Sequence, residues 1–273
     1  MPTAAEKSAA FRALHSSGAP FIMPNPWDAG SARVLEALGF VALATTSSGF
    51  ALTLGRRDYG VTRAEAIAHA RLVAGVVDIP VSADLENGFG PAPEDVNLTI
   101  REACGTGLAG GSIEDSTRDA AHPIFERSRA VERVAAAVDA ARKAGSGFFL
   151  TARAEGFLWG QGDLEEIISR LQAFEDAGAD ALFAPGLPDL DAVRAVCASV
   201  SKPVNVLTMG KLSDCSLEDF AEAGAARISV GGALAWSAYG SLAETAGAIL
   251  PSGRFDTFTA HADGARAVRK ALM

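Results

Sequence analysis

Acidic residues stand at the ends of two successive apolar runs of the sequence. Asp84 and Glu86 close the run that begins at Pro80, and Glu114 closes the next run. Asp84 and Glu86 are two positions apart, so an extended backbone would point both side chains to the same side. Asp58 follows an earlier run, after two arginines, and a loop could bring it to the same place. The sequence therefore contains four carboxylates that could share one site.

Carboxylates that lie close together repel one another unless a cation sits between them. A set of oxygen ligands with no histidine or cysteine nearby favours Mg²⁺ or Mn²⁺ over zinc. We therefore predict that Asp58, Asp84, Glu86 and Glu114 form a metal site, with Mg²⁺ as the cofactor and Mn²⁺ as its substitute. The alternative is that the individual acids cap helices or pair with surface arginines.

Arg153 ends another apolar run, Phe148–Arg153. A guanidinium group can hold a carboxylate or a phosphoryl group through two parallel hydrogen bonds. We predict that Arg153 binds the substrate at the same mouth as the acids. The alternative is a buried ion pair between Arg153 and Glu155 or Glu114, because a buried guanidinium needs an acidic partner.

Polar residues near two further strands are candidates for substrate binding. Thr45, Thr46 and Ser47 follow the second apolar run, where their hydroxyl and backbone N–H groups could surround an anion. Asn205 is a polar side chain inside an otherwise apolar run and could donate a hydrogen bond to a substrate oxygen. A core amide satisfied by its neighbours is the alternative for Asn205.

The elements that must position these residues alternate along the chain. The apolar runs predict eight strands, at Phe21–Pro24, Phe40–Thr46, Pro80–Glu86, Gly107–Glu114, Phe148–Arg153, Ala181–Pro185, Pro203–Leu207 and Arg227–Gly231. Helical segments separate the runs, which favours a parallel sheet covered by helices. We predict a single domain over residues 1–273, folded as a (β/α)8 TIM barrel with an extra N-terminal helix and a terminal helix over Asp256–Leu272. In this fold the carboxyl ends of the strands form the active site.

Composition excludes several classes of function. A net charge of −9 and a pI near 5.0 argue against nucleic-acid and anionic-membrane partners. The longest apolar run, Ala37 to Ala44, is too short to span a bilayer, and we expect a cytoplasmic protein. The cysteines lack CxxC spacing, so neither a zinc site nor a disulfide framework is indicated. His15, His69 and His261 fall in predicted helices and are expected at the surface.

The chain resembles the isocitrate lyase and phosphoenolpyruvate mutase superfamily over essentially its whole length. The matching segments share their order and their placement after strands: Pro24-Asn25-Pro26-Trp27-Asp28-Ala29-Gly30-Ser31, Leu54-Gly55-Arg56-Arg57-Asp58, Asp84-Leu85-Glu86-Asn87-Gly88-Phe89-Gly90, Ile113-Glu114-Asp115 and Thr151-Ala152-Arg153. The resemblance implies a Mg²⁺-dependent barrel that stabilises the enolate of pyruvate or of a close relative. It also implies a homotetramer whose subunits exchange the terminal helix.

The resemblance assigns roles to the candidate residues. Asp84 would bind the metal ion directly, while Asp58, Glu86 and Glu114 would hold its water ligands. Arg153 would bind the carboxylate or the enolate oxygen of the substrate. Thr46 and Ser47 would bind the carboxylate of a small-molecule substrate.

The loop after Glu114 departs from the known members. Members that cleave isocitrate or methylisocitrate carry a cysteine there, and the mutases and phosphonopyruvate hydrolases carry an asparagine and a lysine; all three residues are missing. His122 falls near the column of the missing cysteine and could act as an acid or a base, or be an exposed loop residue. We predict a lyase that cleaves a C–C bond of a small 2-oxo or 2-hydroxy dicarboxylate. The alternatives are P–C bond chemistry on phosphonopyruvate and a catalytically weak carboxylate-binding barrel.

Overall fold

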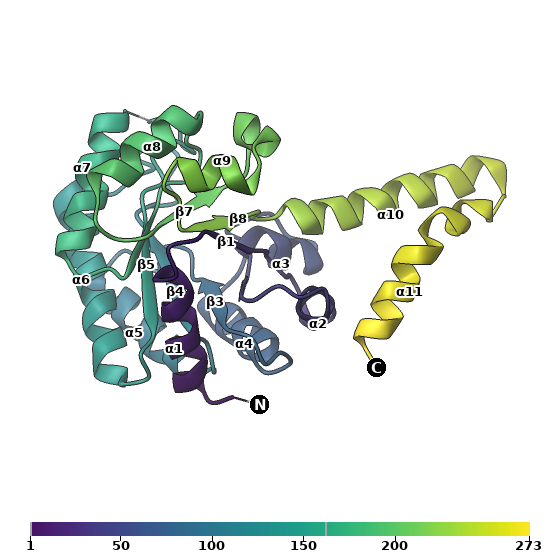
Figure 1. The fold of residues 1–273 in the computed structure, drawn as a ribbon, viewed down its shortest axis with the longest axis horizontal. Helices are drawn as coiled ribbons and strands as arrows, with labels where there is room; N and C mark the ends of the chain where they lie inside the picture. Colours follow the sequence, from purple (N-terminus) through teal and green to yellow (C-terminus); the bar gives the residue numbers. More distant parts are fainter. Residues whose placement is uncertain (1, 162) are drawn as a thin grey trace.

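Eight parallel strands form a nearly closed barrel with helices around it (Figure 1). The computed structural model describes residues 2–161 and 163–273, without the side chain of residue 260. The strands are β1 (Phe21–Met23), β2 (Leu43–Ala44), β3 (Val81–Asp84), β4 (Gly110–Glu114), β5 (Phe149–Arg153), β6 (Ala181–Phe183), β7 (Val204–Leu207) and β8 (Arg227–Ser229). Seven strand pairs run in register from β2 through β8 to β1. A hydrogen bond of 3.1 Å from Ala44 N to Pro24 O joins β2 to the end of β1.

The helices cover the outside of the barrel, as the sequence predicts. They are α2 (Ala29–Ala37), α3 (Ser47–Thr53), α4 (Arg63–Ala74), α5 (Pro93–Cys104), α6 (Arg127–Ala144), α7 (Leu164–Asp176), α8 (Leu190–Ser199) and α9 (Leu217–Glu222), with a 3₁₀ turn η1 (Gly210–Asp214); α10 (Ala233–Ser252) follows β8. Local signals fix several helix ends: Thr62 and Glu65 form a capping box before α4, and Gly145 ends α6 with a left-handed φ of 69°. The (β/α)8 prediction is confirmed.

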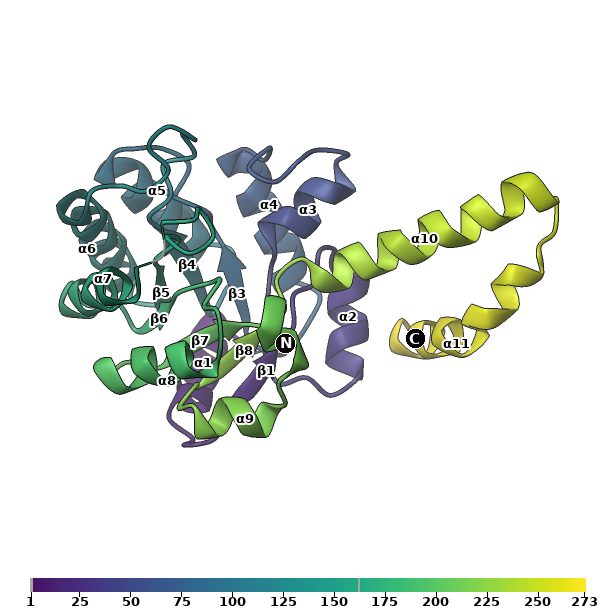
Figure 2. The same ribbon diagram turned by 90° about the horizontal axis from the view of Figure 1, so that it is seen from above.

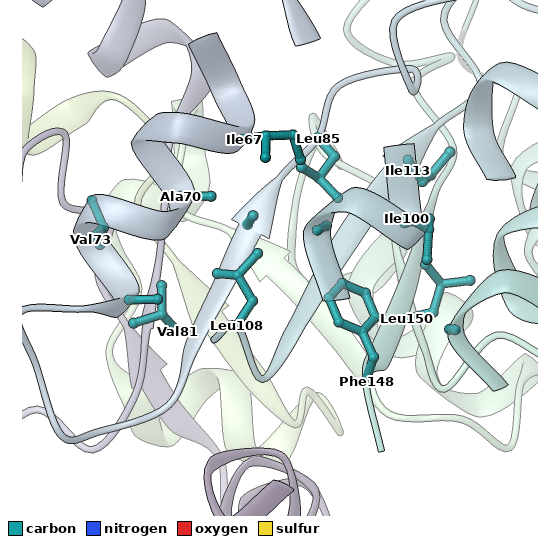
Figure 3. Packing of buried hydrophobic residues seen from close by; sticks show 14 of the residues in the cluster. Ile67, Ala70, Val73, Val81, Leu85, Ile100, Leu108, Ile113, Phe148 and Leu150 are labelled. Atoms are coloured by element: carbon teal, nitrogen blue, oxygen red, sulfur yellow. The ribbon is translucent and has the colours of Figure 1, made fainter. Parts of the chain in front are cut away.

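Apolar side chains fill the space between strands and helices. Figure 3 shows this packing on one side of the barrel, where Ile67 and Val73 of α4 and Ile100 of α5 lie against Val81 and other strand residues. This shared burial fixes each strand relative to its helix, and therefore fixes where each strand ends.

The N-terminal helix α1 (Ala4–His15) packs at the amino ends of the strands. Phe11 of α1 makes edge-to-face contacts with Phe21 at 6.3 Å and with Phe149 at 5.3 Å between ring centroids. His15 stacks on Phe149 at 4.3 Å. This end of the barrel is thus closed by aromatic packing, which leaves the carboxyl ends of the strands for a site.

The C-terminal elements form an arm that leaves the barrel. In Figures 1 and 2, α10 extends away from the strands, and α11 (Ala262–Ala271) turns back toward α2 after the 3₁₀ turn η2 (Asp256–His261). The predicted terminal helix over Asp256–Leu272 is therefore split in two. Ala235, next to α3, is the buried residue of α10, and α11 has none among its described side chains. Among the described helices, none is long and apolar enough to cross a membrane.

Candidate active site

A cavity of about 180 Å³ opens at the carboxyl ends of the strands. Seven of the predicted site residues line it, together with residues of β1, β6 and β8; these seven are Thr45, Thr46, Ser47, Asp58, Asp84, Arg153 and Asn205. A volume of this size suits a small organic acid better than a nucleotide or a sugar chain. The structure thus brings seven of the sequence candidates to one cavity.

Asp84, the last residue of β3, is the centre of the polar network. Its Oδ2 accepts hydrogen bonds from Ser47 Oγ at 2.9 Å and from Ser47 N at 3.3 Å. Its Oδ1 accepts from Arg153 at 3.1 Å, and Thr45 Oγ1 accepts from the Asp84 backbone N–H at 3.0 Å. Ser47 at the start of α3 and Arg153 at the end of β5 therefore both bind the Asp84 carboxylate. A cation that binds Asp84 would replace at least one of these hydrogen bonds.

Arg153 is shared by three carboxylates. Its guanidinium group lies 3.1 Å from Asp84, 3.4 Å from Glu114 and 2.7 Å from Glu155. Glu155 follows β5 and is 1% exposed, so the ion pair with Glu155 that the sequence left open is present. Arg153 also lines the cavity, and therefore both expectations for this residue agree with its position.

The buried carboxylates outnumber the arginines that face them. Burial is the largest cause that raises the pKa of Glu86 to about 8, and burial also raises the pKa values of Glu114 and Glu155. Partial burial of the Asp58 carboxyl, and then the neighbouring Asp84, raise the pKa of Asp58, although the residue as a whole is solvent-exposed. The site therefore contains more carboxylates than positively charged groups to balance them.

The donor set fits a magnesium ion held mainly through water. Among residues 2–161 and 163–273, no three His, Cys, Asp or Glu side chains converge as metal ligands. Mg²⁺ commonly keeps several waters and binds only one or two carboxylates directly. Glu114 Oε1 is buried without a hydrogen-bond partner, which leaves an acceptor for such a water. A cavity of about 10 Å³, with room for one water, lies between Asp84 and Glu86.

Glu86 does not point the way its spacing predicts. Strand β3 ends at Asp84, and Glu86 adopts a left-handed φ of 49°, so the alternation of an extended backbone stops before it. Glu86 faces the small cavity instead of the main one and pairs with Arg118. The alternative that this acid pairs with a surface arginine is thus correct as to the pairing, but the Glu86 side chain is buried, at 2% exposed.

Arg118, in the loop after β4, contacts the loop after α3 and the loop after β3, close to the acids. Its guanidinium carbon lies 5.2 Å from the ring centroids of both Tyr59 and Phe89. Tyr59, Glu86, Phe89 and Arg118 all have positive φ, and they are the non-glycine residues with this conformation in the described chain. Such backbone strain persists where surrounding contacts over-determine it, often at functional sites. The sequence analysis missed this cluster, because no spacing relates its members.

His122 lies away from the cavity. Its side chain is 86% exposed and lies 3.7 Å from Asp119, in the loop that a bridge between Ser116 and Ile124 closes. It lines neither of the two cavities at the strand ends. This position agrees with the exposed-loop alternative, and a catalytic role for His122 stays a prediction without a contact to support it.

Two other expectations need correction. The hydroxyl and backbone groups expected around an anion are partly used within the protein: Thr46 caps the short helix α3 by accepting a hydrogen bond from Gly49 N at 3.2 Å, and Ser47 N donates to Asp84. His15 is half-buried and His69 is buried, not at the surface. His69 stacks on Phe50 of α3 at 3.9 Å and thereby supports the helix that follows Thr46.

Several known proteins are similar to this chain in sequence and structure. A solved Burkholderia cenocepacia J2315 protein, named only provisionally as a lyase/mutase, is 47% identical, with a TM-score of 0.93 over 97% of this chain and 95% of its own. The structure of 2,3-dimethylmalate lyase is 27% identical, with a TM-score of 0.84 over 93% of this chain and 90% of its own. Oxaloacetate decarboxylase of Pseudomonas entomophila (strain L48) is 30% identical over 73% of this chain and 69% of its own. The family described as phosphoenolpyruvate phosphomutase matches residues 11–250, and this chain belongs to it, within the phosphoenolpyruvate mutase and isocitrate lyase superfamily.

Proposed function

We propose that this protein is a Mg²⁺-dependent lyase that cleaves a C–C bond of a small 2-oxo or 2-hydroxy dicarboxylate, of the oxaloacetate or alkyl-malate type. The observation that carries the proposal is the meeting of Ser47, Asp84 and Arg153 at one small cavity, beside carboxylates that lack enough positive charge. Enzymes of the superfamily include lyases and mutases, and the proposal selects the lyases.

The shortage of positive charge around the buried carboxylates supports Mg²⁺ as the cofactor. Asp84 would hold Mg²⁺ directly, and Asp58, Glu86 and Glu114 would hold its water ligands. When bound, Mg²⁺ supplies a Lewis acid next to the 2-oxo or 2-hydroxy group. Without this charge, the buried acids favour protonation, as the raised pKa of Glu86 indicates.

The chain's own residues bind and polarise the substrate. The hydroxyl oxygens of Thr45 and Thr46 accept from backbone N–H groups, so their hydrogens are free to donate to the first carboxylate. The Ser47 hydroxyl would join them when a cation on Asp84 replaces the hydrogen bond between Ser47 and Asp84. Arg153 directs a fixed positive charge at the oxygen on which negative charge grows as the C–C bond breaks. Three carboxylates hold the Arg153 guanidinium group, so it needs no reorganisation when that charge appears.

The loop between Asp115 and Phe125 favours C–C over P–C chemistry. It carries neither the asparagine nor the lysine that the resemblance associates with the mutases and the phosphonopyruvate hydrolases. It also lacks the cysteine of the isocitrate and methylisocitrate lyases, which disfavours isocitrate and methylisocitrate as substrates. Oxaloacetate and alkyl-substituted malates remain as the substrate class.

A substrate panel tests the proposal. Purified protein is incubated with oxaloacetate, alkylated malates, methylisocitrate and phosphonopyruvate, each with Mg²⁺ and with a chelator, and the release of 2-oxo acid is measured against protein-free controls. We expect metal-dependent release from oxaloacetate or an alkylated malate. Release from phosphonopyruvate alone would assign P–C chemistry instead, and no release from any compound would favour a binding protein.

A further inference from the structure

Asp115 comes directly after β4, and its side chain takes the place of a backbone group in the sheet. The pairing of β4 with β5 ends with Glu114 beside Arg153, and Asp115 N then donates to Arg153 O at 3.2 Å. The next hydrogen bond of this parallel series would join Glu155 N to the backbone oxygen of Asp115. Glu155 N donates instead to the side-chain oxygen Oδ1 of Asp115, at 2.8 Å. The Asp115 side chain therefore extends the sheet by one hydrogen bond.

The backbone oxygen of Asp115 is thereby available to the loop over residues 116–124. It accepts from Phe125 N at 2.9 Å, at the point where this loop returns. Arg170 of α7 supports both ends of the loop, because its Nη1 donates to Phe125 O at 2.9 Å and lies 3.4 Å from Asp115 Oδ2. Asp115 and Arg170 are both buried. One buried carboxylate thus joins the loop, the end of β5 and α7.

Glu155, whose backbone Asp115 holds, in turn orients Arg153. Glu155 Oε1 accepts from Arg153 Nε at 3.0 Å and from Arg153 Nη2 at 2.7 Å. The third nitrogen of the guanidinium group, Nη1, is left for the cavity side, where Asp84 Oδ1 accepts from it at 3.1 Å. The Glu155 side chain reaches back two residues to Arg153, so the direction of the guanidinium group depends on where the Glu155 backbone lies.

We propose that Asp115 is a positioning residue that directs Arg153 at the substrate by holding the Glu155 backbone, an inference that rests on the proposed function. In that function, Arg153 binds the substrate oxygen that gains negative charge. A charge-assisted hydrogen bond to this oxygen is strong only when the N–H group points at it. The role of Asp115 therefore requires an acceptor oxygen at this place, and does not require its negative charge.

Two substitutions separate the place of the oxygen from its charge. Asp115→Asn removes the charge and keeps an oxygen that can accept from Glu155 N. Asp115→Glu keeps the charge and displaces the carboxylate by one CH₂ group. Oxalate is titrated calorimetrically into each variant with saturating Mg²⁺, so that a change in metal affinity does not enter. We expect Asp115→Asn to bind oxalate within about threefold of the wild-type affinity, and Asp115→Glu to bind it at least about tenfold more weakly.

Asp180 provides the matched controls, Asp180→Asn and Asp180→Glu. Like Asp115, it is buried, pairs with an arginine, and accepts from a backbone N–H group of the β5 segment, that of Leu150 at 2.9 Å. Leu150 lies near the amino end of β5, and Asp180 does not line the cavity. Both Asp180 variants should lose thermal stability and keep the wild-type affinity for oxalate.

Hydrogen–deuterium exchange of the peptide that contains Glu155 measures the hold on its backbone without a ligand. Exchange should be faster in Asp115→Glu than in Asp115→Asn. Equal oxalate affinities in these two variants, or weaker binding in Asp115→Asn, would overturn the inference. A loss of about tenfold in Asp115→Asn would overturn it even if Asp115→Glu does not fold. A wild-type protein that binds no oxalate with Mg²⁺ would instead remove the proposed function on which the inference rests.

Discussion

At the scale of single residues, Glu86 shows how the site is kept short of positive charge. Its carboxyl is buried beside Asp84 and Asp58, and Arg118, with a smaller effect from Arg153, offsets them only in part. A carboxyl whose pKa is raised by folding contributes stability below its ordinary pKa and loses it as the pH rises through the folded value. A divalent cation reverses this loss, because it stabilises the ionised form.

The stability of the protein is therefore expected to depend on pH and Mg²⁺ together. With a chelator, Glu86 alone should lower the free energy of unfolding by about 2 kcal/mol between pH 6.5 and pH 8.5, and the raised pKa values of Glu114 and Glu155 act in the same direction. The lowered pKa values of His15 and His69 act in the opposite direction, mainly in the lower part of this window, because unfolded histidine is about half protonated at pH 6.5 and neutral at pH 8.5. Melting temperatures measured at both pH values should show a larger gain from Mg²⁺ at pH 8.5.

Glu86→Gln provides the comparison for this measurement. It removes the titrating group and keeps an oxygen that can accept from Arg118. The variant should show a flatter pH dependence with the chelator and a smaller gain from Mg²⁺ at pH 8.5. The same steep dependence in Glu86→Gln would show that another group is responsible.

At the scale of elements, the site depends on loops that only the tertiary structure brings together. The carboxyl ends of β3, β4 and β5 were predictable, because each strand is an apolar run that ends in a charged residue. The turn after Asp84 was not predictable: the left-handed Glu86 is stabilised by contacts with Arg118, a residue 32 positions away. Residue spacing predicts the direction of a side chain inside a regular strand, but it no longer does so beyond the last residue of the strand.

Arg118 should hold the loop between Ser116 and Ile124 closed over the acids. We expect Arg118→Ala to increase thermolysin cleavage within this loop about tenfold, because the ion pair and both aromatic contacts are lost together. Mass spectrometry of early digestion products measures the rate at this site. Arg129→Ala is the matched control, since Arg129 pairs with Glu132 on the surface of α6. Equal cleavage rates in the two variants would exclude this role for Arg118.

At the scale of the whole molecule, the barrel was the most predictable feature, and the contacts between buried polar side chains were the least predictable. Eight alternating units specify the fold, and each unit carries its own turn and cap signals. Arg227, which is buried and lines the cavity, escaped the sequence analysis because a charged residue at the first position of a strand indicates a surface end. Its burial results from α1, which covers the amino ends of the strands and brings His15 to it.

The arm of α10 and α11 exposes apolar side chains that a barrel alone does not cover. Leu250, Phe255 and Phe258 are 89%, 67% and 57% exposed. Large exposed apolar groups on one element are typical of subunit interfaces. The arm therefore supports the homotetramer with an exchanged terminal helix as a proposal about how the chain assembles.

Size-exclusion chromatography with light scattering tests this assembly. We expect the wild-type protein to elute as a tetramer and the double variant Phe255→Ser/Phe258→Ser to shift to smaller species. Leu72→Ser is the control, because Leu72 is 53% exposed on α4, away from the arm. A monomeric wild-type protein would contradict the proposed assembly.

The central claim is that a divalent cation on Asp84 and a small carboxylate bind together. Calorimetric titration of oxalate, a planar mimic of the carboxylate and adjoining oxygen of a 2-oxo acid, tests it most directly. We expect oxalate to bind the wild-type protein with Mg²⁺, not to bind with a chelator, and to bind Asp84→Asn at least about tenfold more weakly. Oxalate binding of equal strength with chelator, or in Asp84→Asn, would contradict the claim.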